Sequence, residues 1–359
     1  MIDGTLVVDA VLHAYNFTPE NVKNPELISK LSMMLYGLCA GYAPRNQPEY
    51  TLDFERFMSA PDVDLLAHAV FAESPTDIGI YHEVPQWGSL KDGGSPMWVA
   101  KELRDRYPGR VAIYGALSPW YGDPIETIDR LVEEDGVVGI KLYPLDIVDG
   151  KPQSFRMDDQ EVMFPLFEHM QKRGIRSVGV HKALPLGPLP MDPFRIDDME
   201  GALAAFPDLF FEIVHGGMAF LEETTMQLAR FPNCAINLEG GSAFLPNMPM
   251  KFAEVLGSFL SFGAEDRIIW ATGCIAFHPR PLVERFWNFE FPPMLTEGYG
   301  VPPLTKEIKA KILSGNVARI VGLDLDEMTR QSAGDEFSDR DELAAPWTGG
   351  RVAAAAAAS

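Results

Sequence analysis

Short apolar runs of strand-like composition recur along this chain, and segments with helical apolar spacing separate them. Such alternation is typical of a parallel sheet built from βα units. We count eight runs, which predicts an α/β fold, a (β/α)8 (TIM) barrel with long βα loops, because eight strands close a sheet without an edge. The runs begin at Leu6, Asp64, Arg110, Val137, Arg176, Leu209, Cys234 and Arg267. An open doubly wound sheet is the alternative, although no glycine-rich phosphate loop follows any run.

Long connections follow several of the predicted strands, among them residues 28–39 and 82–96. In a barrel these connections lie at the face where catalysis is built. Their Trp, Met, Phe and Pro content predicts a lid over an apolar cavity. Met33, Met34 and Leu35 could instead form an interface between subunits, and we expect a homodimer because that is the commonest closed assembly.

The barrel is expected to span residues 1–324, and the remaining segment, residues 325–359, differs in composition. It is polar and then rich in alanine, so we predict a C-terminal tail that is flexible or docks on a partner.

Charge and cysteine content narrow the classes of partner and compartment. The chain has 30 Lys and Arg against 51 Asp and Glu, and its formal net charge of −21 would repel nucleic acid. The three cysteines are scattered, which favours a reducing compartment over a disulfide framework. No signal peptide and no membrane-spanning apolar run is evident, so we expect a cytoplasmic protein with no membrane partner.

Three of the seven histidines occupy the last position of a predicted strand. They are His13, His181 and His215, and Lys141 lies near the end of a fourth strand. Strand ends converge on the mouth of a barrel, so these side chains predict one site with metal-ligating or acid/base chemistry. Of the others, His68 is expected to pack within a strand, His169 to lie on a helix, and His82, in a loop, is left unassigned.

The order of these features resembles a known family. Asp9 and His13 lie on the first strand, GIKLYP begins at Gly139, VHGG begins at Val214, and a closing helix KAKILSGNVARIVGLD begins at Lys309. Together with His181 they are similar to the amidohydrolase-related superfamily, in the branch with aminocarboxymuconate semialdehyde and resorcylate-type decarboxylases. The resemblance covers residues 1 to about 324 and implies the same barrel.

The resemblance also implies roles for individual residues. His13 and His181 would be ligands of a divalent metal (Zn, Mn or Fe), and His215 would orient water or polarise the substrate. Lys141 matches a lysine whose role varies within the family.

Two expected ligands are missing. Val11 stands where the family has its first metal-binding His, and Gly273 stands where it has an Asp that is both ligand and base. Cys274, Glu239 or His278 could complete an altered metal site, since catalytic zinc usually has three protein ligands. Alternatively, the site works without metal, with Lys141, His215, His278 and Glu239 as acid/base groups and Cys274 as nucleophile.

We therefore expect a hydrolase acting on a small cyclic or aromatic carbonyl or carboxylate compound. Nonoxidative decarboxylation of an aromatic acid is one alternative, and a noncatalytic ligand-binding barrel is another. The catalytic candidates are His215, Lys141, Cys274 and Glu239, and the substrate-binding candidates are Tyr15, Asn16, Trp120, Tyr143 and His278.

Overall fold

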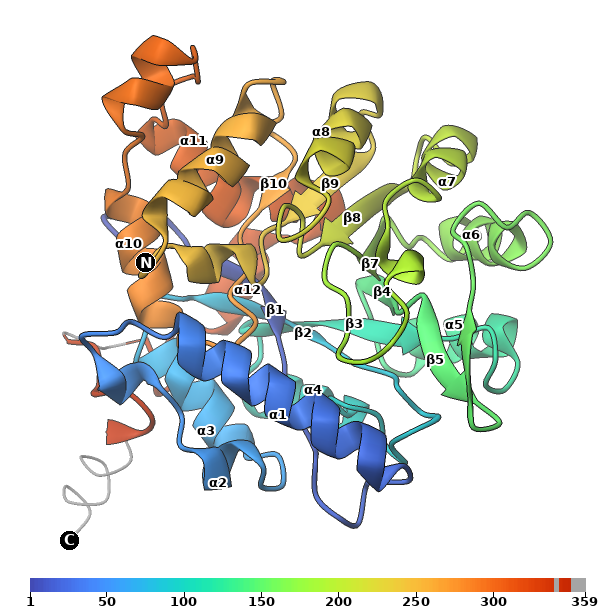
Figure 1. Ribbon diagram of the computed structural model, residues 1–359. Coiled ribbons are helices and arrows are strands. Elements are labelled where there is room, and N and C mark those ends of the chain that lie inside the picture. The colour runs from blue at the N-terminus through green and yellow to red at the C-terminus, as the bar shows by residue number, and fades with distance from the viewer. Residues whose placement is uncertain (339–341, 350–359) are drawn as a thin grey trace, which may run out of the picture.

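Eight parallel strands form the centre of the molecule in this computed structural model, which describes residues 1–338 and 342–349 (Figure 1). Each of these eight strands pairs with the next barrel strand in chain order, which gives the order β1-β2-β3-β4-β7-β8-β9-β10. The strands are β1 (Val8–Leu12), β2 (Ile78–His82), β3 (Val111–Leu117), β4 (Gly139–Leu142), β7 (Ser177–His181), β8 (Phe210–Val214), β9 (Cys234–Asn237) and β10 (Ile268–Ile269). The remaining two strands, β5 (Leu145–Val148) and β6 (Lys151–Ser154), form an antiparallel hairpin after β4. The predicted (β/α)8 barrel is confirmed.

The barrel closes where β1 meets residues 270–275. The backbone N–H of Ala10 donates to the carbonyl oxygen of Trp270 (3.1 Å), and that of Gly273 donates to the carbonyl oxygen of Val11 (3.1 Å). A further bridge joins Leu12 to Cys274. Both ends of the sheet thus lose their free edge, as closure of a barrel requires.

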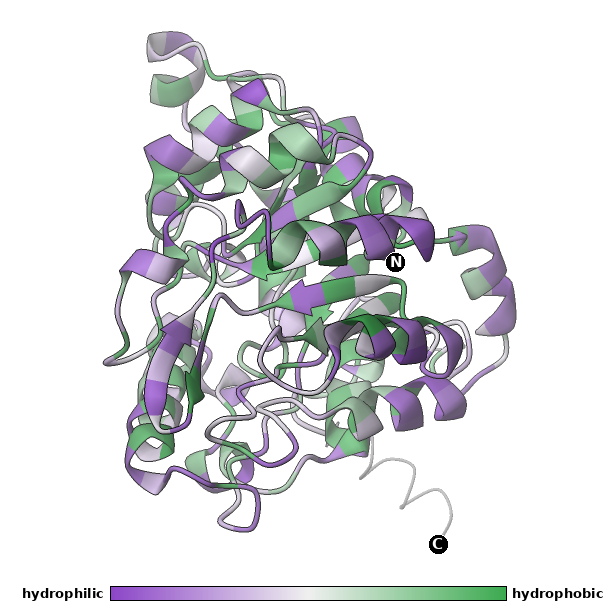
Figure 2. Ribbon diagram, turned by 90° about the vertical axis from the view of Figure 1, so that its right-hand side faces the viewer, coloured by the Kyte–Doolittle hydropathy of each residue, from purple (hydrophilic) through white to green (hydrophobic). Residues whose placement is uncertain are grey.

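Helices pack around the strands, and Figure 2 shows hydrophobic residues prevailing along the strands while hydrophilic residues are frequent on the surrounding helices. Those between Pro25 and Glu133 are α1 (Pro25–Tyr42), α2 (Phe54–Phe57), α3 (Val63–Ala67), α4 (Met97–Arg106) and α5 (Pro124–Glu133). Those between Met163 and Leu260 are α6 (Met163–Lys172), α7 (Met199–Ala205), α8 (Leu221–Arg230) and α9 (Pro249–Leu260). The last three are α10 (Pro279–Asn288), α11 (Lys306–Ala310) and α12 (Leu325–Gln331). Within the described residues, no helix has the length and apolar character needed to cross a membrane.

The second predicted strand is wrong. The segment from Asp64 is helical: α3 begins after Asp62, whose carboxylate accepts a hydrogen bond from the N–H of Leu65 (2.9 Å), and a π-helical turn continues over His68–Ala72. The actual strand is β2, which begins at Ile78, 14 residues after Asp64, and ends on His82. The apolar residues of the helix are buried, so a short apolar run alone did not separate helix from strand.

The described part of the tail packs against the barrel. Phe337 is only 3% exposed and lies in the main core cluster beside Phe71 and Tyr107, while Arg110 makes a two-pronged ion pair with Asp335 (2.7 and 2.8 Å). The alanine run lies outside the described residues.

Candidate active site

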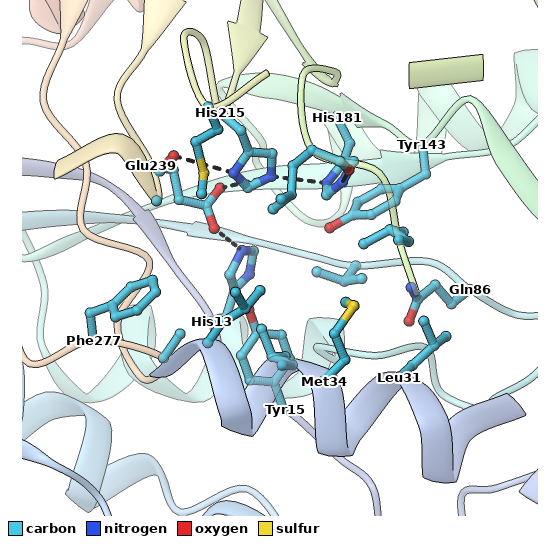
Figure 3. Close-up of a pocket in the computed structure, with 18 of the residues that line it drawn as sticks. His13, Tyr15, Leu31, Met34, Gln86, Tyr143, His181, His215, Glu239 and Phe277 are labelled. Atoms are coloured by element: carbon cyan, nitrogen blue, oxygen red, sulfur yellow. Dashed lines mark hydrogen bonds and ion pairs between the residues drawn. The ribbon is translucent and has the colours of Figure 1, made fainter. Parts of the chain in front are cut away.

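A cavity opens at the carboxyl ends of the strands and contains about 800 Å³ of atom-free space, counting its mouth. It is lined by His13, Tyr15, Phe17, Leu31, Met34, Leu35, Leu38, Tyr42, Val84, Gln86, Tyr143, His181, Leu184, Leu186, His215, Met218, Glu239, Gly240, Ala276 and Phe277. Polar groups gather on one side, while Figure 3 shows Leu31 and Met34 reaching toward them from α1. The backbone N–H of Gly187 contacts the Met34 sulfur (3.2 Å), so α1 is joined across the cavity to the loop after β7. Met34 and Leu35 therefore belong to a lid, whereas Met33 is 52% exposed.

His13 and Glu239 form a buried pair on the polar side of the cavity (Figure 3). His13 Nε2 lies 3.3 Å from Glu239 Oε1, and His13 Nδ1 lies 3.1 Å from the carbonyl oxygen of His82. Burial acts to raise the pKa of Glu239, but His215 and His13 beside it hold that pKa well below its usual range. Glu239 is therefore a carboxylate.

His181 and His215 form a second pair beside the first. His215 Nε2 lies 3.0 Å from His181 Nδ1 and 3.7 Å from Glu239 Oε2. The other nitrogen of each ring faces a backbone carbonyl oxygen. His181 Nε2 lies 2.9 Å from the carbonyl oxygen of Leu184, and His215 Nδ1 lies 3.2 Å from the carbonyl oxygen of Glu239. Burial lowers the pKa of His215 to about 4 and that of His181 well below its usual value, so both rings are neutral near pH 7.

Two tyrosines complete the polar side. The Tyr143 ring stacks on His181 with centroids 4.5 Å apart, and the Tyr15 ring lies 5.3 Å from that of His13. Burial raises the pKa of both phenols well above the usual value, so each hydroxyl keeps its proton and can donate it to a ligand.

Lys141 lies one layer deeper in the barrel than these groups. It pairs in register with Gly179 of β7, two residues before His181. Its ammonium is buried, has no hydrogen-bond partner among the described residues, and lies 5.7 Å from the Tyr143 ring centroid. Burial lowers the pKa of Lys141 to about 8, against the attraction of Glu239 and Glu212. The lysine is thus a buried charge behind the cavity wall.

Sequence reasoning missed His82. It ends β2, is fully buried, and stacks on Tyr114 with ring centroids 4.4 Å apart. Neither ring nitrogen of His82 has a hydrogen-bond partner among the described residues, and its carbonyl oxygen faces His13. The sequence does contain a pattern that could have identified His82. IGIYH is an apolar run that ends on histidine, as do the predicted runs that end on His13, His181 and His215.

The structure does not bring Cys274 or His278 to the cavity, since neither lines it. Burial raises the pKa of the Cys274 thiol well above its usual value, which opposes the thiolate needed for a ligand or nucleophile. His278 Nε2 lies 3.0 Å from Glu73, and His278 Nδ1 accepts from the N–H of Arg280 (3.3 Å), so this ring caps α10.

Asn16 and Trp120 also lie outside the lining of the cavity. The Asn16 side chain accepts the hydroxyl hydrogen of Thr18 (2.8 Å), and Trp120 packs on Phe155. Of the five predicted substrate-binding residues, only Tyr15 and Tyr143 line the cavity.

Gly273 lies so close to the Glu239 side chain that there is no room for a side chain at residue 273. Gly273 has φ +76°, and a Cβ built there would lie 2.9 Å from Glu239 Oε1. A side chain at this position would therefore collide with the Glu239 carboxylate, which fills the place where the resembling family has its Asp.

The residues present do not fit a metal centre of the kind that the resemblance implies. Within the described ranges, no three His, Cys, Asp or Glu side chains are grouped so that they could hold a metal ion. Val11 and Gly273 offer no donor, and the inward nitrogens of His181 and His215 contact each other.

Comparisons with known proteins agree with this architecture. The family model described as "Amidohydrolase" matches residues 59–323. An uncharacterized TIM-barrel protein from Bordetella bronchiseptica is 18% identical, with TM-score 0.59 over 88% of this chain and 98% of that one. A 2,6-dihydroxybenzoate decarboxylase complexed with 2,6-dihydroxybenzoate is 16% identical, with TM-score 0.54 over 89% and 100%.

An amidohydrolase from Burkholderia multivorans with bound zinc is 14% identical, with TM-score 0.54 over 89% and 99% of the two chains. No curated protein sequence matches the chain. Because the family model covers well over half of the chain, this protein belongs to the amidohydrolase family.

Proposed function

We propose that this protein hydrolyses a small cyclic or aromatic carbonyl compound, with His215 as general base, and that it does so without a bound metal. The observation that carries the proposal is the arrangement of the two pairs, His13 with Glu239 and His215 with His181, on one side of an enclosed apolar cavity. Titratable groups with strongly shifted pKa values in such a cavity are typical of a catalytic site.

In this geometry His215 can take up the proton of an attacking water. When His215 Nδ1 donates to the carbonyl oxygen of Glu239, its Nε2 is unprotonated, and it can accept a proton that then lies between it and His181 Nδ1. The imidazolium so formed is stabilised by His181 Nδ1 at 3.0 Å and by the Glu239 carboxylate at 3.7 Å. The water oxygen forms a bond to the carbonyl carbon, and the proton returns to the leaving oxygen when the carbon–oxygen bond breaks.

Tyr143, stacked on His181, supports the same step. Figure 3 shows its hydroxyl directed into the cavity, where it can donate to the carbonyl oxygen as negative charge develops there. Lys141, one layer deeper, adds positive charge without touching the substrate.

Decarboxylation of an aromatic acid is the second candidate, and the solved decarboxylase with its bound dihydroxybenzoate favours it. Incubation in oxygen-18 water separates the two reactions. Hydrolysis of a lactone such as dihydrocoumarin incorporates the label, whereas decarboxylation of 2,6-dihydroxybenzoate releases carbon dioxide. Carbon dioxide release without label incorporation would replace the first candidate by the second, and turnover of neither compound class would favour a binding protein.

A pair of glutamate variants tests the site itself. Glu239→Gln removes the charge that stabilises the His215 imidazolium formed during the reaction, so kcat should fall by at least about 100-fold. Glu254→Gln, a matched change at an exposed position of α9, should leave kcat unchanged. Equal activity of the two variants would contradict the proposal. Metal analysis of the purified protein should give well below one equivalent, and full occupancy that depends on His13 and His181 would restore the predicted metal site.

A further inference from the structure

The cavity wall has no positively charged side chain of its own. Among the described residues that line it, none is a lysine or arginine, and the wall opposite the histidines consists largely of apolar side chains such as Leu31, Met34 and Leu38 from α1. Gln86 adds one neutral amide. A carboxylate in this cavity would find no lysine or arginine among the described lining residues to pair with its charge, and a buried charge without an ionic partner is costly.

The two nearest lysines are held away from the cavity. Lys141 lies behind the wall in the layer of Glu212, since both pair in register with Gly179. Lys182 follows His181, but its ammonium is buried and bound to the Asp198 carboxylate (2.7 and 2.8 Å) and to a carbonyl oxygen. Neither lysine lines the space that a ligand would occupy.

Among the described residues that line the cavity, Glu239 is the acidic one. Its Oε1 lies 3.3 Å from His13 Nε2. A ligand carboxylate would compete with Glu239 for this imidazole, while a ligand cation would compete with His13 for Glu239. The formal net charge of −21 for the whole chain also disfavours the approach of anions.

We infer that the substrate is uncharged: an apolar cyclic or aromatic ester or lactone, and not a free carboxylic acid. The inference rests on the proposed function for the carbonyl chemistry, but the selection against charge depends only on the wall of the cavity.

Binding of matched ligands tests the selection without turnover. Titration calorimetry compares coumarin, which is neutral, with coumarin-3-carboxylate, and benzyltrimethylammonium reports on cations. Coumarin should bind at least about tenfold more tightly than either charged ligand. Equal or tighter binding of coumarin-3-carboxylate by the wild-type protein would overturn the inference.

A lysine placed in the wall should reverse the preference. Met34→Lys introduces an ammonium at the cavity, so coumarin-3-carboxylate should gain about tenfold in affinity relative to coumarin. Met33→Lys makes the same change one residue earlier, at a side chain that is 52% exposed, and should leave the ratio as in wild type. An equal gain in both variants would show a general charge effect and contradict the inference. Gln86→Arg is the second wall variant if Met34→Lys does not fold.

The outcomes also separate this inference from the proposed function. If coumarin is preferred but no lactone or ester is hydrolysed, the proposed function fails and the selection for neutral ligands stands. If only anionic lactones are hydrolysed, the proposed function stands and the inference fails.

Discussion

Gly273 and Glu239 constrain each other. The space where a side chain at residue 273 would begin is in contact with the Glu239 carboxylate. An Asp at 273 would need both a strained backbone at φ +76° and displacement of Glu239. The two positions therefore cannot both carry a carboxylate in this arrangement.

Asp9 provides a prediction at the scale of one residue. Its buried carboxyl accepts hydrogen bonds from the backbone N–H (2.9 Å) and the hydroxyl of Thr272, and burial raises the pKa of Asp9 to about 7 despite them. The folded state therefore keeps a proton that the unfolded state has lost, and stability falls as pH rises from about 4 to about 7. Asp9→Asn cannot titrate. Between pH 5 and pH 8 the wild type should lose about 3 kcal/mol of unfolding free energy relative to the variant.

Urea unfolding at the two pH values measures this difference. The control variant is Asp123→Asn, because Asn at this position keeps the cap on α5. Asp77→Asn is unsuitable as a control, because the Asp77 carboxylate accepts a hydrogen bond from the backbone N–H of Val7 (2.9 Å). A parallel pH dependence of wild type and Asp9→Asn would contradict the assignment of the proton to Asp9.

At the same scale, the sequence located part of the site. His13, His181 and His215 were predicted from their positions at strand ends, and all three line the cavity. Cys274 lies five residues after β10 ends at Ile269, and its side chain does not reach the cavity. Strand position predicts which end of the barrel a residue occupies, but the direction of a side chain after the strand depends on backbone turns that composition does not encode.

Among the elements, the sequence predicted seven of the eight strand regions and misplaced one. The error at Asp64 had a local cause, since apolar residues at adjacent positions fit both a buried strand and a helix packed on the barrel. The same error hid His82, because a histidine assigned to a loop could not be recognised as one at a strand end.

At the scale of elements, the stability of the lid helix α1 depends on a contact at its C-terminal end. Its C-terminal end is held by the Asn247 amide, which donates to the carbonyl oxygens of Ala43 (2.8 Å) and Tyr42 (3.3 Å). Asn247→Ala removes these bonds, which contribute about 1 kcal/mol, so amide exchange in residues 25–42 should become roughly fivefold faster. Hydrogen exchange with mass spectrometry measures the change. Asn288→Ala, at an exposed helix end, should leave exchange in α1 unchanged.

At the scale of the whole molecule, the described part of the tail belongs to the folded body rather than lying beside it. Phe337→Ala removes a ring that is 3% exposed and should lower the unfolding free energy by about 3 to 4 kcal/mol. Phe262→Ala, where the ring is 49% exposed, should change it by less than about 0.5 kcal/mol. Chemical denaturation compares the two, and equal effects would show that the tail does not stabilise the barrel.

The closure of the barrel between β1 and residues 270–275 also determines when the site can form during synthesis. His13 emerges near the start of the chain, but its backbone N–H is bound by the carbonyl oxygen of Cys274, and the Asp9–Thr272 contact spans 263 positions. Contacts so distant in sequence form late in folding. A ribosome-bound chain that stops before residue 270 holds His13, His181, His215 and Glu239 yet lacks residues 270–275, which fix His13 beside the others. Catalytic competence should therefore appear abruptly, once residues 270–275 have left the ribosome, and no shorter N-terminal fragment should show a fraction of it.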